Sequence, residues 1–266
     1  MGIMGSKIFS RNKFKKEESF DKIFTPLNKS PTLKVEVIHM IIGFIPARGG
    51  SKGIPRKNLS LVGTQTLLEL GVEKLWTSGC DRVYVSTDST EIMSKALEYG
   101  SKVVVRPEEI SGDEASTESA INHFLRSENI LGEEIIVLHQ LTSPFIQVDS
   151  IKSCINMLSI HSEINSCFTA LDRHAFTWEK QEDNTWSPVN HQRNLRLRRQ
   201  ELPERVIESG GVYAFRAKEF LAQATRYAKP SAIIKINYLE NFEIDSQEEL
   251  LEANYIQERI GDSFET

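Results

Sequence analysis

The 266-residue sequence has few cysteines and no long apolar run, and these absences exclude several classes of protein. The three cysteines, Cys80, Cys154 and Cys167, lie far apart and form no Cys-x-x-Cys pair, so we expect neither a zinc site nor a redox pair. No stretch approaches the ~18 consecutive apolar residues of a membrane-spanning helix, and no apolar signal-peptide core follows the first basic residues. We therefore expect a cytoplasmic enzyme that does not bind membranes.

The sequence also lacks the basic excess that is typical of proteins that bind nucleic acids. It has 32 Lys and Arg against 37 Asp and Glu, which gives a net charge of −5. An arginine cluster at residues 193–199 has no interleaved aromatic residues for base stacking, so we expect no nucleic-acid partner. With 39% hydrophobic residues, a chain of this length buries a large core without disulfides.

The first 39 residues differ in kind from the rest of the chain. They contain eight Lys and Arg against four Asp and Glu, and their apolar residues follow no sustained period. A clear apolar strand begins only at Met40, which is therefore a candidate for the natural start codon. We interpret residues 1–39 as a poorly ordered N-terminal extension and residues 40–266 as a single domain.

Short apolar runs alternate with helical apolar stripes from Met40 onward. This alternation predicts an α/β fold, with a doubly wound, mostly parallel sheet and helices on both faces. Residues 176–200 break the pattern with two tryptophans and several arginines, and we interpret them as an inserted arm. A closing helix is predicted at residues 246–260, and the predicted strands are residues 41–46, 82–86, 102–105, 134–139, 166–171, 211–215 and 233–238.

The loop after the first strand has the composition of a phosphate-binding segment. Residues 48–58 contain three glycines, one serine and four cations. Glycines let backbone N–H groups approach anionic oxygens, while Arg and Lys neutralise a di- or triphosphate. The loop is neither a Walker motif nor a GxGxxG fingerprint, which argues against a nicotinamide-dependent oxidoreductase. The simpler alternative is a solvated basic turn.

The string Ile-Pro-Ala-Arg-Gly-Gly-Ser-Lys-Gly-Ile-Pro-Arg-Lys-Asn at residues 45–58 resembles the signature of the acylneuraminate cytidylyltransferases. These nucleotidyltransferases activate sialic and related nonulosonic acids as CMP-sugars. The resemblance extends from about residue 41 to residue 250. It implies a Rossmann-like sheet and a reaction in which CMP passes from CTP to the anomeric hydroxyl of a nine-carbon acid of the sialic, legionaminic or pseudaminic type. It also implies a homodimer in which the inserted arm reaches the neighbouring subunit.

Matching the family's motifs position by position assigns roles to residues of this chain. The catalytic group comprises Arg48, Lys52, Lys57 and Asp245. The nucleotide-binding group comprises Ala47, Gly49, Gly50, Ser51, Asn58, Asp88, Arg106 and Thr117. The sugar-binding group comprises Gln140, Arg199, Ser209 and Tyr213.

Several of these positions also have a purely structural interpretation. Asp88 or Ser89 is a good N-cap for a helix that begins near Thr90, and the alternative for the block from Arg106 to Thr117 is a loop with a helix cap. His139, next to Gln140, is interpreted as a packed residue and not as a catalytic base.

The segment Glu243-Ile244-Asp245 is the candidate metal site. Alternation along an extended strand places both carboxylates on one side, where they could share a hard cation. The family has Asp-Ile-Asp here for Mg²⁺, so the resemblance implies Mg²⁺ as cofactor, with Glu243 in place of the first Asp. The alternative is that Ser246 and Glu249 form a capping box and that the nearby acidic residues stabilise the helix N-terminus without metal.

The departures from the family pattern leave other hypotheses open. Ser209 stands for the usual Asn, Leu141 for the usual Pro, and Glu243 for Asp, so a non-catalytic nucleotide-binding relative is one alternative. Another is activation of a Kdo-type acid, although the Gln-Gly-Asp-type motif of those synthetases is absent after the fourth predicted strand. No side chain identifies itself as the general base.

Overall fold

A seven-stranded sheet forms the centre of the computed structural model, which describes residues 39–50, 53–195 and 197–262. The strand order is β11-β7-β10-β6-β1-β4-β5. Every neighbouring pair is parallel except that β10 runs antiparallel to both β6 and β7, which confirms the mostly parallel prediction. The strands are β1 (Ile41–Pro46), β4 (Arg82–Thr87), β5 (Lys102–Val105), β6 (Ile135–His139), β7 (Ser166–Asp172), β10 (Val206–Arg216) and β11 (Ser231–Ile236).

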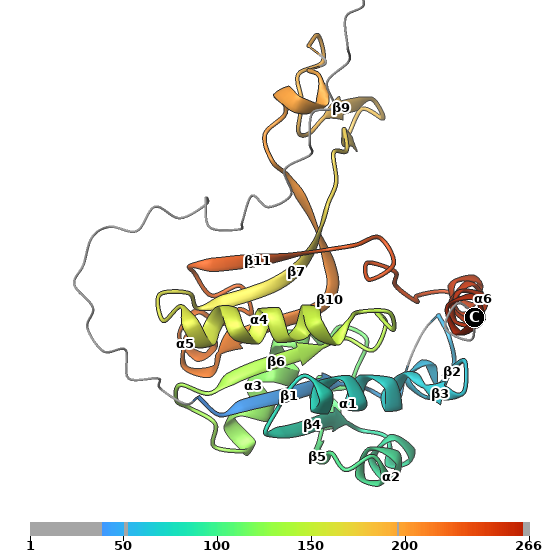
Figure 1. Cartoon of the computed structure of the whole chain (residues 1–266), viewed down its shortest axis with the longest axis vertical. Helices are drawn as coiled ribbons and strands as arrows, with labels where there is room; N and C mark the ends of the chain where they lie inside the picture. Colours follow the sequence, from blue (N-terminus) through green and yellow to red (C-terminus); the bar gives the residue numbers. More distant parts are fainter. Residues whose placement is uncertain (1–38, 51–52, 196, 263–266) are drawn as a thin grey trace, which may run out of the picture. The chain divides into compact units, whose positions relative to one another are not determined.

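Helices cover both faces of this sheet, so the doubly wound prediction is confirmed (Figure 1). One face packs against α1 (Leu67–Thr77), α2 (Thr90–Glu98), α4 (Val148–Ile160) and α6 (Gln247–Asp262). The other packs against α3 (Thr117–Ser127) and α5 (Ala217–Gln223). All five residues of β6 are buried, as expected for a strand that is covered on both sides.

Side-chain caps fix where the helices begin at the edge of the sheet. The Ser89 hydroxyl accepts the N–H of Ile92 at the start of α2, so Ser89 and not Asp88 is the N-cap. Ser116 caps α3 in the same way.

The last strand was predicted at residues 233–238, two residues too far along the chain. It ends at Ile236, because Asn237 already belongs to a turn in which its N–H donates to the Glu240 carboxylate.

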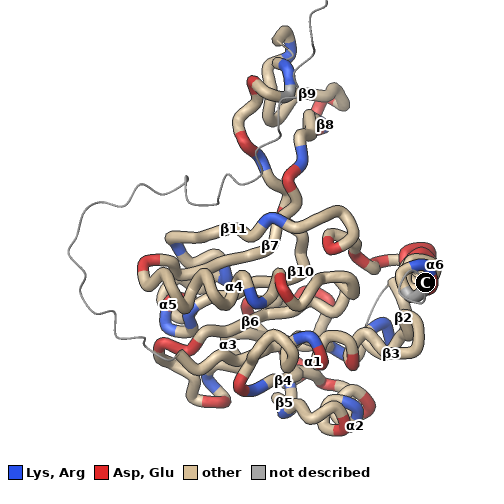
Figure 2. Tube along the Cα trace, in the orientation of Figure 1, with Lys and Arg blue, Asp and Glu red and all other residues tan. Residues whose placement is uncertain are grey.

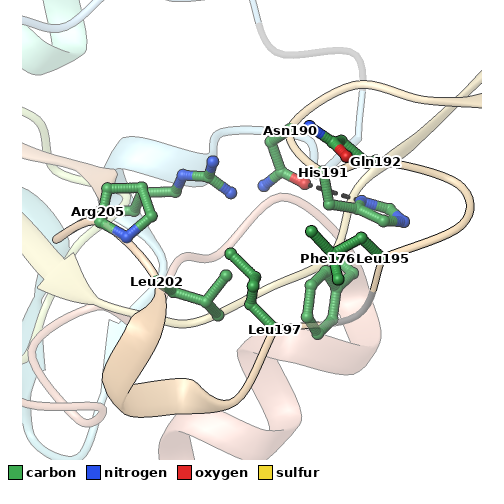
Figure 3. Close-up of a pocket in the computed structure, with 9 residues that line it drawn as sticks. Phe176, Asn190, His191, Gln192, Leu195, Leu197, Leu202 and Arg205 are labelled. Atoms are coloured by element: carbon green, nitrogen blue, oxygen red, sulfur yellow. Dashed lines mark hydrogen bonds between the residues drawn. The ribbon is translucent and has the colours of Figure 1, made fainter.

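The segment between β7 and β10 leaves the sheet and extends beyond it (Figure 1). It contains the predicted arm, and within it β8 (Trp178–Lys180) and β9 (Trp186–Pro188) pair as an antiparallel hairpin that the sequence did not predict. Trp178 and Trp186 are 44% and 55% exposed. A cavity of about 190 Å³ in the arm is lined mainly by apolar side chains, among them Phe176, Leu195, Leu197 and Leu202 (Figure 3).

Charges of both signs occur throughout the described part of the chain. Acidic and basic residues are interspersed along the sheet domain and along the arm (Figure 2). None of the described helices is both long and apolar enough to cross a bilayer. The short elements are η2 (Lys57–Leu59), η3 (Glu108–Ile110), η4 (Arg199–Glu201) and the small hairpin of β2 (Leu61–Val62) and β3 (Gln65–Thr66).

Candidate active site

The loop after β1 is held at the carboxyl edge of the sheet by contacts with its neighbours. Ala47 is buried, and its N–H donates to the Ser86 carbonyl over 2.9 Å. The Gly49 N–H donates to Oδ1 of Asp88 over 2.7 Å, so Asp88 orients the glycine-rich backbone. Farther along, the Asn58 amide donates to the Arg48 carbonyl over 2.9 Å. The predicted residues Ala47, Gly49, Asp88 and Asn58 therefore belong to one structural unit.

Two arginines lie at neighbouring strand ends, since Arg48 belongs to the loop after β1 and Arg106 follows β5. The Arg48 guanidinium donates to the Gly112 carbonyl over 2.8 Å and pairs with Asp113 at 3.0 Å. Arg106 is buried and donates to the Ser86 hydroxyl and carbonyl over 3.2 and 3.0 Å. Burial lowers the pKa of Arg106, and nearby Arg48 lowers it further, while Asp88 acts in the opposite direction. The structure thus gathers predicted residues from three successive strand ends.

The loop also lies against the candidate metal segment, almost 190 residues away in the sequence. Lys57 Nζ donates to the Ile244 carbonyl and to Oδ1 of Asp245, each over 3.0 Å. A side chain at Gly53 would overlap the Asp245 carbonyl oxygen, so this close approach requires glycine. Gly50 is described and has open space around its Cα, whereas Ser51 and Lys52 lie outside the described residues.

The candidate metal segment lies outside the strands of the structure, between β11 and α6. Ile244 is fully buried, and its N–H donates to the Thr142 carbonyl over 2.8 Å. Glu243 and Asp245 flank this buried residue and are half-buried and exposed, respectively. The capping box is also formed, since the Ser246 N–H donates to Glu249 over 2.8 Å and the Glu249 N–H donates to the Ser246 hydroxyl over 3.2 Å. The capping box leaves the carboxylates of Glu243 and Asp245 outside its hydrogen bonds, so it is compatible with a metal site at these two residues.

A large bulge in β10 brings the third group of residues to this edge. Glu208 pairs with Ala170 and Tyr213 pairs with Phe168, so residues 209–212 stand opposite Thr169 alone. Gly210 has a φ of 73°, and a Cβ there would overlap the Glu243 carboxylate. The Gly211 carbonyl accepts the N–H of Gln140 over 2.9 Å, which ties the loop after β6 to the bulge. Such bulges are concentrated next to active sites.

The family model of the cytidylyltransferases matches residues 42–260 of this chain. The chain belongs to the cytidylyltransferase family. It is 33% identical over 187 residues to N-acylneuraminate cytidylyltransferase A of Danio rerio, a match that covers 69% of this chain but only 43% of that protein. It is 29% identical over 189 residues to pseudaminic acid cytidylyltransferase of Campylobacter jejuni, covering 67% of this chain and 79% of the relative. The chain thus spans less than half the length of the fish relatives that it matches.

A solved structure gives the same fold. A CMP:2-keto-3-deoxy-manno-octonic acid synthetase in complex with CTP aligns with a TM-score of 0.61 at 14% identity, over 82% of this chain and 98% of the other. At that identity the likeness supports the nucleotidyltransferase fold alone.

Two of the positions at which this member of the family departs from the family pattern have structural explanations. Leu141 is 4% exposed and packs against Gly71 of α1, so its side chain belongs to the core. Ser209 is 2% exposed, and its hydroxyl shares a 2.6 Å hydrogen bond with Thr169 and accepts the Gly211 N–H over 3.3 Å. In this structure the Ser209 side chain stabilises the bulge, and a sugar contact there stays a prediction.

The remaining predicted positions lie in α3, β10, η4 and the loop after β6. Thr117 is the first residue of α3, and the Gln140 side chain is half-buried beside the bulge. Tyr213 is buried and donates a hydrogen bond to Glu208. Arg199 begins η4, but its side chain lies outside the described residues.

His139 is a packed residue, as its sequence context indicates. It is 1% exposed, and its Nδ1 lies 3.2 Å from the Gly211 carbonyl. Burial, together with the charge of Lys74, lowers the pKa of His139 to about 4. The imidazole is therefore neutral at physiological pH, and its Nδ1 contacts the Gly211 carbonyl of the bulge.

The chemistry of the donor set at Glu243 and Asp245 fits a hard cation. Within the described residues no group of three or more His, Cys, Asp or Glu side chains could hold a metal ion. Mg²⁺, however, is often bound by only one or two carboxylates together with substrate phosphates. Burial raises the pKa of Glu243, and the negative charges of Asp245, Glu249 and Glu208 raise it further, whereas Lys57 opposes them. A divalent cation at this position would relieve that repulsion.

Sequence reasoning missed one acidic residue of this site, Glu208. It lies just outside the block that resembles the family, and its partners are Tyr213 and Tyr227. The available signal was the Gly210-Gly211 pair within a strand, since glycine inside a strand often marks a bulge. A bulge there would bring residues on its two sides into contact.

Proposed function

We propose that this protein transfers CMP from CTP to the anomeric hydroxyl of a nine-carbon nonulosonic acid of the sialic, legionaminic or pseudaminic type. The products are a CMP-sugar and pyrophosphate. Family membership supports the reaction class, and the names of the relatives in fish and Campylobacter support the class of sugar. The observation that carries the proposal is the contact of Lys57 with both Ile244 and Asp245, because it joins the cationic loop to the acidic segment.

The proposed reaction is a single displacement at the α-phosphorus of CTP. The sugar hydroxyl oxygen forms the new P–O bond, its proton is released, and pyrophosphate leaves with the electrons of the broken bond. Phosphoryl transfer depends mainly on positioning and on charge stabilisation. Arg48 and Lys57 are the described cations that would contact the triphosphate, while the backbone of Gly49 and Gly50 would approach its oxygens. Lys52 is proposed to join them.

Carboxylates hold Arg48 and Lys57 in place. Arg48 is 30% exposed beside Asp113, and Lys57 is 15% exposed beside Asp245. Each side chain therefore loses little additional freedom when it meets a phosphate, which is the benefit of preorganisation. In this proposal, Arg106 and Thr117 lie at the nucleotide end of the site, and Gln140, Arg199 and Tyr213 at the sugar end.

Asp245 and Glu243 would hold the Mg²⁺ ion of this family. When bound, the metal would neutralise phosphate charge and lower the pKa of an oxygen that it coordinates. The residues themselves provide one exposed and one half-buried carboxylate, and Lys57 places the phosphate loop beside them.

The exposed Trp178 and Trp186 support a further proposal, that the arm makes the contact of a homodimer.

Pyrophosphate release with CTP, Mg²⁺ and one nonulosonic acid at a time tests the proposal. N-acetylneuraminic, legionaminic, pseudaminic and Kdo-type acids form the panel. We expect release with a nine-carbon acid and a loss of at least a hundredfold in Lys57→Met. The matched control is Lys95→Met, which removes an exposed lysine paired with Glu98 on α2. Equal activity of Lys57→Met and Lys95→Met would remove the loop from the mechanism.

A further inference from the structure

The carboxylate of Glu208 receives two phenolic hydrogen bonds on one oxygen. The hydroxyls of Tyr213 and Tyr227 both donate to Oε1, the latter over 2.6 Å. Glu208 itself is exposed at the surface, whereas Tyr213 is only 2% exposed. No ion pair between Glu208 and a Lys or Arg occurs among the described residues. The lone pairs of Oε2 are therefore available to a donor that comes from outside the chain.

Aromatic packing fixes the direction of the two phenols. The rings of Tyr213 and Tyr227 meet edge to face with centroids 5.7 Å apart, and Phe168 packs against both. The Arg226 guanidinium carbon lies 4.8 Å from the centroid of Tyr213. Arg226 also forms a bidentate pair with Glu118, at 2.8 and 3.2 Å. The guanidinium thus pairs with Glu118 and not with Glu208.

Both phenols keep their protons under physiological conditions. Burial raises the pKa of Tyr213 and of Tyr227, and the charge of Glu208 raises both further. Each hydroxyl therefore acts as a donor to the carboxylate and holds it in one orientation. A carboxylate held in this way is a preorganised acceptor of hydrogen bonds.

The position of Glu208 links it to the candidate active site. It borders the β10 bulge, whose Gly210 lies against Glu243, and its charge contributes to the raised pKa of Glu243. On the other side, Glu118 follows Thr117 at the start of α3. The cluster thus extends from the candidate metal segment to the proposed nucleotide block.

We propose that Glu208 is a specificity-determining residue that accepts hydrogen bonds from hydroxyl or amide N–H groups of the sugar acid. This inference rests on the proposed function. An ionised carboxylate accepts hydrogen bonds and repels anions, so it faces the polyol or N-acyl part of the sugar and directs the sugar's own carboxylate away. Tyr213 and Tyr227 act as positioning residues, because they orient Glu208.

Steady-state kinetics of Glu208→Ala, Glu208→Gln and Tyr227→Phe test this role. Hydrogen bonds to a charged group predict a rise of roughly tenfold to a hundredfold in the KM for the sugar with Glu208→Ala. The KM for CTP and kcat should stay within about threefold of the wild type. Glu208→Gln and Tyr227→Phe should give smaller rises in the same constant. The matched control, Glu128→Ala, removes an exposed carboxylate at the far end of α3 and should change nothing.

Two results would overturn the inference while leaving the proposed function intact. One is an unchanged sugar KM in all three variants, and the other is a loss of kcat with unchanged sugar KM, which would indicate a general base. Thermal unfolding of each variant identifies a folding defect. If the Glu208 variants are defective, the sugar KM of Tyr227→Phe tests the inference instead, since this variant retains the ring and its packing.

A separate measurement keeps the two proposals distinguishable. If the wild-type protein forms no CMP-sugar from any acid of the panel, the proposed function fails. Isothermal titration calorimetry with N-acetylneuraminic and pseudaminic acids then measures, without any reaction, whether Glu208 contributes to binding of the acid. Binding heat in the wild type that disappears in Glu208→Ala supports the inference. Equal heats, or no heat in either protein, overturn it.

Discussion

The contact of Gly53 with Asp245 leads to a sharp prediction for Gly53→Ala. The new Cβ would overlap the Asp245 carbonyl oxygen, and restoring ordinary van der Waals contact requires a shift on the order of 1 Å. That shift separates the cationic loop from the segment that carries Asp245 and weakens the contacts of Lys57. A displacement of this size in an active site costs about a hundredfold in rate.

The assay is pyrophosphate release as a function of Mg²⁺ and CTP concentration. We expect kcat/KM for Gly53→Ala to fall by about two orders of magnitude, or ~2.7 kcal/mol in transition-state stabilisation, with a higher Mg²⁺ requirement. Gly132→Ala is the control, because it precedes β6 at the opposite edge of the sheet and its Cβ would meet only the end of the Glu134 side chain. A kcat/KM for Gly53→Ala within threefold of this control would refute the coupling between loop and metal segment.

Three further perturbations test other parts of the account. Asp245→Asn should raise the Mg²⁺ concentration for half-maximal activity at least tenfold, as measured by metal titration, and an unchanged titration would place the metal elsewhere. The pKa of His139 is about 4 when folded and about 6.5 when unfolded, so the unfolded state takes up a proton first as pH falls and stability decreases below about pH 6.5. Denaturant unfolding at pH 7 and pH 5 should show that loss, about 2 kcal/mol, in the wild type and in the exposed-site control His161→Gln but not in His139→Gln; equal losses in all three would contradict it. Trp178→Ser with Trp186→Ser should shift the mass measured by light scattering toward the monomer, and an unchanged mass would exclude the hairpin from a dimer contact.

The sequence predicted the sheet because its strands are covered on both sides. β1 and β6 are continuous apolar runs, so their bounds were predicted to within a residue. The position of the loop after β1 was predictable for a different reason: Arg48, Gly49 and Lys57 follow one strand end, and parallel strands bring their carboxyl ends to one edge. Local signals were sufficient in both cases.

Contacts between distant segments were not predictable in this way. The β10 bulge places four residues opposite Thr169. No pattern in the local sequence predicts which residues before the bulge contact which residues after it. The same holds for Ser209, whose hydroxyl bonds to Thr169 inside the sheet, and for Glu208, which depends on Tyr227 from a later turn. The arm hairpin was missed because β8 and β9 have only three residues each, which is too short for a period.

The most direct test of the proposed reaction follows the phosphorus atoms themselves. Phosphorus NMR of the purified protein with CTP, Mg²⁺ and N-acetylneuraminic, legionaminic or pseudaminic acid would distinguish the possible products. The account predicts that the CTP signals are replaced by one phosphodiester signal and pyrophosphate in equal amounts, with one of these acids only. Intact CTP with every acid, or its hydrolysis to CDP and phosphate, would contradict the account.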